Sequence, residues 1–210
     1  MRDLTVVVLA KEPRPGRVKT RLVPAWGVQG AADLARAALL DTMETVGELP
    51  CRRVLALDGA VGPWLTGASG WSVIPQRGDG QAARIAAACC EVGGPVLLIG
   101  MDTPQLAVDD LAAAADALRD HDSVVGPSTD GGWWLLGQQE PDPRALADVP
   151  MSTAQTCSAQ VRALRLLGQR VALLHRLRDV DEPADVEAVA ALVPRSRFAR
   201  AARLLGSVPA

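Results

Sequence analysis

Residues 4–10 read LTVVVLA and residues 11–21 read KEPRPGRVKTR, and these two adjoining stretches decide the fold class. A continuous run of β-branched and other apolar residues is typical of a strand that is buried on both faces of a parallel sheet. The basic stretch that follows, with its prolines and glycine, is predicted to be a loop. Ligands of open parallel sheets bind beyond the carboxyl ends of the strands, so this loop is a candidate binding element.

Strand-like and helix-like stretches alternate along the rest of the chain. Strands separated by helices of about a dozen residues predict βαβ units. The expected fold is α/β, with three αβα layers around a mostly parallel, doubly wound sheet, in one domain over residues 1–210. Further strands are expected at 53–57, 71–74, 95–99, 123–125, 132–136 and 171–174. Helices are expected at 29–46, 81–91, 108–118, 154–167, 183–192 and 196–205.

A C-terminal helical tail is expected at about 195–210, where four arginines alternate with apolar residues. This pattern predicts a solvated helical face that covers the core, and a polyanion-binding tail is the alternative. The tail is also a candidate contributor to a homodimer.

Composition excludes several classes of protein. The 210 residues carry a net charge of −2, which argues against a nucleic-acid partner. The longest apolar runs hold about seven residues, far fewer than the roughly 20 that span a membrane. Four scattered cysteines without CxxC spacing indicate reduced thiols, and residues 1–3 do not begin a signal peptide, so we expect a cytoplasmic protein. The two histidines, His121 and His175, lack ligand-like spacing, which argues against a His/Cys metal centre or a Ser-His-Asp hydrolase.

The basic loop is the first candidate site. It holds five cations and one acid, and it contains the only two lysines of the chain, Lys11 and Lys19. Gly16 permits close approach of the backbone, and lysine provides a compact charge where arginine provides a rigid fork. The loop therefore predicts contacts to a diphosphate or triphosphate, although it matches neither the GxGxxG nor the Walker pattern. The alternative is an exposed charged loop.

Asp102, in the stretch GMDTP at 100–104, follows the expected strand at 95–99. A carboxylate fixed at the end of a central strand is well placed to hold Mg²⁺ or Mn²⁺ beside a nucleotide phosphate. The alternative, capping of the helix that begins near Val108, is unfavourable because Asp102 lies too far upstream.

The third candidate is the stretch GPSTDGGWWLLG at 126–137. Asp130, Gly131 and Gly132 predict a sharp turn with room for a ligand against the backbone. Trp133 and Trp134 are expected to face opposite sides of a strand, so that one of them can stack on a sugar or base. Burial of both rings in the core is the alternative.

Four ordered stretches resemble a bacterial family that was once classified as a domain of unknown function and is now usually called the family-A-type glycosyltransferases. They are residues 9–22 (LAKEPRPGRVKTRL), 97–106 (LLIGMDTPQL), 126–137 and 178–189 (RDVDEPADVEAV). The family belongs to the nucleotide-diphospho-sugar transferase superfamily, which has the GT-A fold and also contains nucleotidyltransferases. The resemblance spans about residues 4–192.

The resemblance implies roles for individual residues. Asp102 would bind the divalent metal, and Lys11, Lys19 and Arg21 would contact phosphates beside the backbone of Gly16. Asp130 would act as a second metal ligand or as a base, a role for which Asp181 competes; capping of the helix at 183 is the other interpretation of Asp181. Lys19 and Asp130 are the expected catalytic residues. The acceptor side is expected to contain Gly131, Gly132, Trp133, Ser152 and Thr153.

The sequence also departs from the family pattern. Pro104 stands where many glycosyltransferases have the second acid of an Asp-x-Asp pair, and this single-acid form also resembles nucleotidyltransferases. Ala82-Ala83-Arg84 replaces the usual Gly-Glu-Arg, and Met151 replaces a Trp before Ser152.

The leading hypothesis is a Mg²⁺- or Mn²⁺-dependent glycosyltransferase that uses a nucleotide sugar and a small-molecule acceptor. The first alternative is a nucleotidyltransferase that joins a nucleoside triphosphate to a phosphorylated or carboxylated acceptor and releases pyrophosphate. The second alternative is a nucleotide-binding module without turnover.

Overall fold

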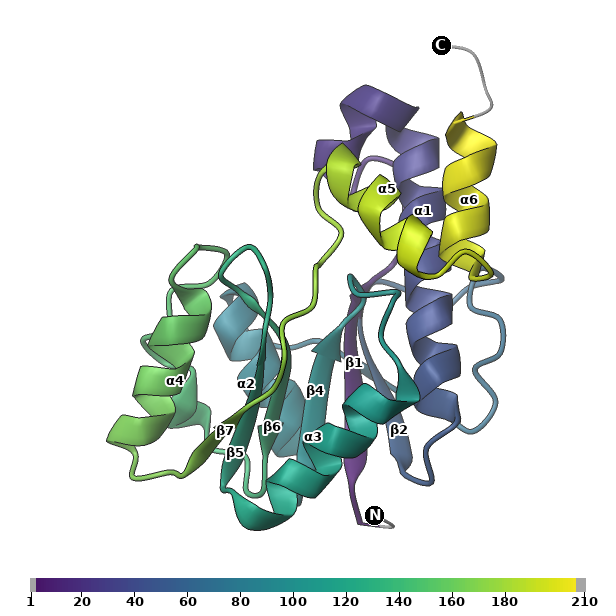
Figure 1. Ribbon diagram of the computed structural model, residues 1–210. Helices are drawn as coiled ribbons and strands as arrows, with labels where there is room; N and C mark the ends of the chain where they lie inside the picture. Colours follow the sequence, from purple (N-terminus) through teal and green to yellow (C-terminus); the bar gives the residue numbers. More distant parts are fainter. Residues whose placement is uncertain (1–2, 207–210) are drawn as a thin grey trace.

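The computed structural model describes residues 3–206, and one seven-stranded sheet forms its centre (Figure 1). The strand order is β3-β2-β1-β4-β6-β5-β7. Neighbouring strands are parallel except where β6 is involved, which runs antiparallel to both β4 and β5. The expected mostly parallel α/β sheet is confirmed. Its strands are β1 (Thr5–Lys11), β2 (Arg52–Asp58), β3 (Ser72–Pro75), β4 (Val96–Gly100), β5 (Ser123–Pro127), β6 (Trp133–Gln138) and β7 (Val171–Leu173).

Core forms on both faces of the sheet because its central strands carry apolar side chains in both directions. On β1, Val6 and Val8 belong to one core cluster, whereas Val7 belongs to the cluster on the opposite face. All three side chains are fully buried. Successive side chains of a strand point to opposite faces, so an uninterrupted apolar run suits a strand that is covered on both sides.

Helices cover the two faces of the sheet. Helices α1 (Val23–Gly47) and α3 (Val108–Asp120) pack on one face, and α2 (Gly80–Val92) and α4 (Thr156–Leu166) pack on the other (Figure 1). Two short 3-10 helices, η1 (Thr20–Leu22) and η2 (Pro143–Ala145), lie in connections. Among residues 3–206, no helix combines the length and the apolar character that crossing a bilayer requires.

Helix α1 begins six residues before the expected start at Gln29. Gly27 interrupts it with φ 67° and ψ 173°, so the helical periodicity recognised in the sequence corresponds to the part beyond this break. A residue without a Cβ adopts such a positive φ at little cost.

Helices α5 (Pro183–Leu192) and α6 (Arg197–Gly206) pack with α1 in a third cluster beyond the carboxyl end of β1 (Figure 1). The buried carboxylate of Asp41 on α1 accepts hydrogen bonds from the backbone N–H groups of Arg197 (3.1 Å) and Phe198 (2.8 Å). These bonds satisfy donors that the start of α6 leaves without helical partners. The expected tail is thus helical over Arg197–Gly206, and residues 207–210 lie outside the described residues.

Candidate functional site

Three segments meet at one edge of the sheet because of strand direction and register. Lys11 at the end of β1 pairs with Asp58 at the end of β2, and Leu9 pairs with Gly100 at the end of β4. Strand β6 runs the opposite way, so its beginning, rather than its end, lies at this edge. The basic loop, Asp102 and the turn before Trp133 therefore converge.

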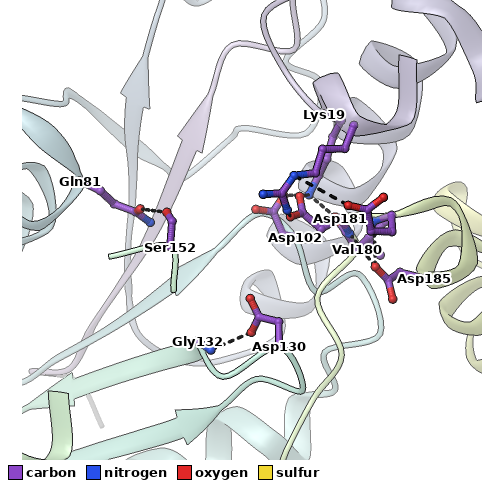
Figure 2. A network of polar contacts seen from close by, with 11 residues as sticks. Lys19, Gln81, Asp102, Asp130, Gly132, Ser152, Val180, Asp181 and Asp185 are labelled. Atoms are coloured by element: carbon purple, nitrogen blue, oxygen red, sulfur yellow. Dashed lines mark hydrogen bonds and ion pairs between the residues drawn. The ribbon is translucent and has the colours of Figure 1, made fainter. Parts of the chain in front are cut away.

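Lys19 links the basic loop to Asp102 and to residues 180–181 (Figure 2). Its ammonium lies 2.7 Å from Asp102 Oδ1 and 3.9 Å from Asp181 Oδ1, and it donates a hydrogen bond to the carbonyl of Val180. The Lys19 side chain is only 8% exposed, although it carries a full charge. A buried ammonium requires oxygen partners, and here segments distant in the sequence provide them.

The backbone of Lys19 is itself unusual. It adopts φ 48° and ψ 43° immediately before η1, a left-handed conformation that is uncommon for residues other than glycine. Strained backbone of this kind costs about 1–3 kcal/mol and is common at functional sites. The conformation and the ion pairs together fix the position of the Lys19 charge.

Arg21 and Asp181 complete the same network. The Arg21 guanidinium pairs with the carboxylate of Asp181, and the backbone N–H of Val180 donates to the carbonyl of Asp102 (2.8 Å). The Asp181 side chain does not cap α5. That role belongs to Asp185, whose carboxylate accepts from the N–H groups of Asp181 (3.1 Å) and Glu182 (2.8 Å). The capping interpretation of Asp181 is therefore corrected, because its carboxylate is engaged by Arg21 and Lys19, while Pro183 does occupy the first turn.

Asp102 likewise has no capping role. Helix α3 has Ala107 at its N-cap, and the Asp110 carboxylate accepts from the Ala107 N–H (2.8 Å). The Asp102 side chain is 44% exposed and faces the cleft, so it remains open to a ligand on the side away from Lys19.

The turn at Asp130–Gly132 is rigid for a steric reason. Gly131 has φ 92°, and a Cβ at this position would lie 2.1 Å from the carbonyl oxygen of Ala154. The Gly131 carbonyl also accepts a hydrogen bond from the N–H of Cys157 (2.9 Å). Asp130 Oδ1 accepts from the N–H of Gly132 (2.7 Å), which holds an otherwise exposed carboxylate at the cleft (Figure 2).

The two tryptophans point to opposite faces of the sheet, as expected. Trp134 is 2% exposed and belongs to the core cluster beneath α1 and α3, where its Nε1 donates to the carbonyl of His175 (3.2 Å). Trp133 is only half-buried, packs against the opposite cluster and lines the cleft. Its buried Nε1 has no hydrogen-bond partner among the described residues.

Ser152 and Thr153 lie across the cleft from the basic loop. Ser152 has a left-handed φ of 58°, and its hydroxyl donates to the Gln81 side chain at the start of α2 (3.2 Å; Figure 2). Thr153 Oγ1 accepts from the N–H of Gln155 (3.2 Å). Both residues line the cleft together with Met151.

The first part of the cleft, here named the loop compartment, is a cavity of about 600 Å³ beside residues 11–21. Positive charge dominates it, because five cations and only two carboxylates are among its lining residues. Such an excess suits a polyanion. The cations are Lys11, Arg17, Lys19, Arg21 and Arg84, and the carboxylates are Asp102 and Asp181.

The second part, the turn compartment, is a cavity of about 540 Å³ beside residues 130–132. Negative charge dominates here, with four carboxylates and one cation, Arg21. The two compartments share seven lining residues, so they form one cleft: Leu9, Arg21, Gln81, Gly100, Asp102, Ser152 and Asp181. The four carboxylates are Asp102, Asp130, Asp179 and Asp181.

Most of the expected site residues line this cleft, with two exceptions. Gly16 lines neither compartment, and its φ of 76° serves the turn of the basic loop. Gly131 lines a neighbouring pocket instead of the turn compartment.

Asp179 is a site residue that the sequence did not single out. Burial, together with the nearby charges of Asp130 and Asp102, raises the pKa of its carboxyl to about 6 against the opposing effect of Lys19. Sequence reasoning placed the chemistry of this segment on Asp181. The signal available in the sequence was the presence of two acids that flank Val180.

Two carboxylates of the cleft could supply ligands to a divalent cation. Among residues 3–206, no three acidic, histidine or cysteine side chains form a complete cage. Asp102 and Asp181 both pair with the Lys19 ammonium, and both also line the cleft, where their remaining oxygens face a ligand. Mg²⁺ is usually held by one or two carboxylates, with substrate phosphates and water as the other ligands. This donor set therefore suits Mg²⁺ or Mn²⁺.

Comparison with protein families gives one match. The model of a family described as an uncharacterised protein conserved in bacteria (DUF2064) matches residues 41–153, which is more than half of the chain. The matched span contains Asp102, the Asp130–Gly132 turn, Ser152 and Thr153. No curated protein matches the chain.

Solved structures share the fold. A protein from Desulfovibrio desulfuricans G20, provisionally assigned as a nucleotide-diphospho-sugar transferase, superposes with a TM-score of 0.88 at 23% identity, over 99% of this chain and 96% of that one. A 2-C-methyl-D-erythritol 4-phosphate cytidylyltransferase from Thermus thermophilus gives 0.56 at 16% identity, over 98% and 100%. Rv0371c from Mycobacterium tuberculosis H37Rv, solved in complex with manganese, gives 0.52 at 20% identity, over 90% and 97%. These likenesses confirm the expected nucleotide-diphospho-sugar transferase fold.

Proposed function

The chain belongs to the bacterial family DUF2064, and from this premise we propose that it is a metal-dependent transferase that moves a glycosyl group from a nucleotide sugar to a small-molecule acceptor. The observation that carries the proposal is the division of charge within one cleft. A cationic compartment adjoins an acidic one, and Arg21, Asp102 and Asp181 belong to both. A donor with a diphosphate and an acceptor with a hydroxyl group need these two environments side by side.

The diphosphate of the donor would bind in the loop compartment. Lys11 and Arg17 line it and make no ion pair within the described part of the chain, so their charges are available to phosphate oxygens. Lys19 and Arg21 add charge from fixed positions. Positive charge that is fixed before the reaction stabilises the charge that develops on a leaving nucleoside diphosphate.

Asp102, with Asp181, would hold Mg²⁺ or Mn²⁺ at the boundary of the compartments. When bound, the metal supplies positive charge to the donor phosphates and to the leaving group. The manganese complex of the structurally similar Rv0371c supports this choice of ion.

The acceptor would bind in the turn compartment. Trp133 offers a ring edge or face to a sugar, and Ser152 and Thr153 offer hydroxyl groups. The pair of Asp130 and Asp179 would take the proton of the attacking hydroxyl. A carboxyl group with a pKa of about 6 is ionised at neutral pH and accepts a proton more readily than an ordinary aspartate.

Nucleotidyl transfer is a second candidate because the stretch at 100–104 contains one acid, with Pro104 in place of another. The structural similarity to a cytidylyltransferase favours the same alternative. In that reaction a phosphate or carboxylate oxygen of the acceptor would attack the α-phosphorus of a nucleoside triphosphate, so that the nucleotidyl group joins the acceptor and pyrophosphate is released. Both reactions use the same cationic compartment.

The released product distinguishes the candidates. The purified protein with MnCl₂ is incubated with a panel of nucleotide sugars and, separately, with the four nucleoside triphosphates, each with pooled small-molecule acceptors. Release of a nucleoside diphosphate supports glycosyl transfer, whereas release of pyrophosphate assigns nucleotidyl transfer. Metal-dependent nucleotide binding without either product would make the chain a binding module, and the absence of such binding would exclude all three. Asp130→Asn should retain nucleotide binding and lose turnover.

A further inference from the structure

A third cavity, of about 590 Å³, is lined by residues of α4, by Leu173 at the end of β7 and by Arg176 in the segment that follows. We name it the arginine pocket, because Arg162, Arg165 and Arg176 line it. None of its lining residues is acidic. Among residues 3–206, these three arginines make no ion pair, whereas ten other arginines do, so the charge of the pocket is uncompensated.

The arginines are positioned by regular backbone. Arg162 and Arg165 are three residues apart on α4, which places them on one face of the helix. Ser158 precedes Arg162 by one turn and also lines the pocket. Arg176 lies in a segment that continues along β5, where the N–H of Leu177 donates to the carbonyl of Pro127 (3.2 Å).

The pocket also has an apolar side. Leu166 is 81% exposed and Leu173 is 55% exposed, and both line the pocket together with Val161 and Pro127. Large apolar side chains this exposed beside unpaired guanidinium groups indicate a ligand with an apolar part and an anionic group.

The arginine pocket adjoins the turn compartment. Ser128 and Ala154 line both cavities, and Gly131 faces the arginine pocket while its neighbours Asp130 and Gly132 face the turn compartment. Cys157 also lines the arginine pocket. Burial raises the pKa of its thiol, Arg176 lowers it and Asp130 raises it. An anion held by the arginines would therefore lie next to the compartment that contains the Asp130 carboxylate.

We propose that the arginine pocket binds the anionic end, a phosphate or carboxylate, of an acceptor whose aliphatic part packs on Leu166 and Leu173. The acceptor hydroxyl then reaches the turn compartment over Gly131. This inference rests on the proposed function, since it specifies the acceptor of that reaction. It excludes neutral sugars as the preferred acceptors.

The test uses hexyl phosphate, which is monomeric in solution, with inorganic phosphate and hexanol as comparators. Calorimetry at low salt, without nucleotide or metal, should show tighter binding of hexyl phosphate than of either comparator. The double variant Arg162→Ala/Arg165→Ala should lower the affinity for hexyl phosphate about tenfold or more, and Arg176→Ala should lower it about 3- to 10-fold. Leu166→Ser should lower the affinity for hexyl phosphate and leave the affinity for inorganic phosphate unchanged.

Two control variants locate the bound phosphate. Arg200→Ala removes an exposed arginine of α6 that also lacks an ion pair among the described residues, and it should leave binding unchanged. Lys11→Ala removes a cation of the loop compartment, where phosphate can also bind, and it should weaken hexyl phosphate binding less than Arg162→Ala/Arg165→Ala does. Loss of binding in Lys11→Ala but not in Arg162→Ala/Arg165→Ala would overturn the proposal. So would binding to vesicles of anionic lipid in the absence of binding to hexyl phosphate, because it would assign this face to a membrane surface.

Nucleotide binding with MnCl₂ is measured on the same variants. If the protein binds nucleotide but none of the variants changes the binding of hexyl phosphate, the proposed role of the arginine pocket is refuted. The proposed function is then unaffected. Arginine-dependent binding of hexyl phosphate without any nucleotide binding refutes the proposed function and retains an anion site.

Discussion

The loop compartment and the turn compartment adjoin each other, yet different physical effects fix the positions of their charged side chains. In the loop compartment, charges are fixed by other charges: Lys19 by Asp102 and Asp181, and Arg21 by Asp181. In the turn compartment, Asp130 is fixed by a backbone turn that only glycine permits at Gly131.

The difference has a consequence for substitution. Electrostatic positioning depends on partners, salt and pH, so changes in the loop compartment should alter ligand affinity more than folding. Steric positioning does not depend on those conditions, so a change at Gly131 should affect the folded structure itself. Four experiments test this contrast.

The largest effect is expected from Gly131→Ala. The added Cβ would meet the Ala154 carbonyl at 2.1 Å and would also force alanine to φ 92°. Overpacking and backbone strain together should lower the free energy of unfolding by about 4 kcal/mol, measured by urea titration. Gly67→Ala is the matched control, because Gly67 has a similar φ of 75° with no atom within 4 Å. Equal losses in the two variants would show that the turn is not sterically locked.

Asp102→Ala should reduce metal-dependent nucleotide affinity about 100-fold, because it removes the carboxylate expected to hold the ion between the compartments. Calorimetry with a nucleoside diphosphate, with and without MnCl₂, measures the effect. Asp109→Ala, which removes an exposed acid from α3, is the control and should bind as the unchanged protein does. Persistence of the metal-dependent increase in Asp102→Ala would rule out the metal assignment.

Lys19→Gln should lower the affinity for the same nucleoside diphosphate by about tenfold. The side chain stays polar and similar in size but loses a charge-assisted contact. The free energy of unfolding should fall less in Lys19→Gln than in Gly131→Ala, because Lys19 is held by charge and Gly131 by steric contact. Arg14→Ala is the control, since Arg14 belongs to the same loop but lines neither compartment. An unchanged affinity in Lys19→Gln would return the loop to the alternative of an exposed charged segment.

The smallest effect is expected from Asp179→Asn. The Asp179 carboxyl has a pKa of about 6 in the folded protein and near 3.8 in the unfolded chain. The folded state therefore keeps the carboxyl proton to a higher pH than the unfolded chain does. The stability contributed by the protonated carboxyl is therefore present below about pH 4 and lost as the pH rises through 6. Asp179→Asn should be more stable than the unchanged protein by about 1 kcal/mol at pH 7.5, given solvent screening, and equal to it at pH 4. Urea titrations at both pH values without added metal measure the difference, and a pH-independent difference would contradict the assignment.

Local patterns made much of the fold predictable. The apolar run at 4–10 predicted a strand covered on both faces, as observed, and the expected helix at 183–192 matches α5 to the residue. The break at Gly27 was not predictable, because one glycine within a helical pattern does not reveal whether its φ is positive. The reversed direction of β6 was also hidden, since the residues at 132–136 suit either direction.

The sequence by itself determined that a basic loop and an isolated acid follow two buried strands, because alternation of apolar and polar stretches is encoded residue by residue. Only the tertiary structure decided which acids meet those cations. Asp179 and Asp181 reach the cleft because the chain after β7 crosses the end of the sheet, and Asp130 reaches it because β6 is antiparallel. Charge interactions depend on distance in space, and no local pattern specifies the distance between residues as far apart in the chain as Arg21 and Asp181.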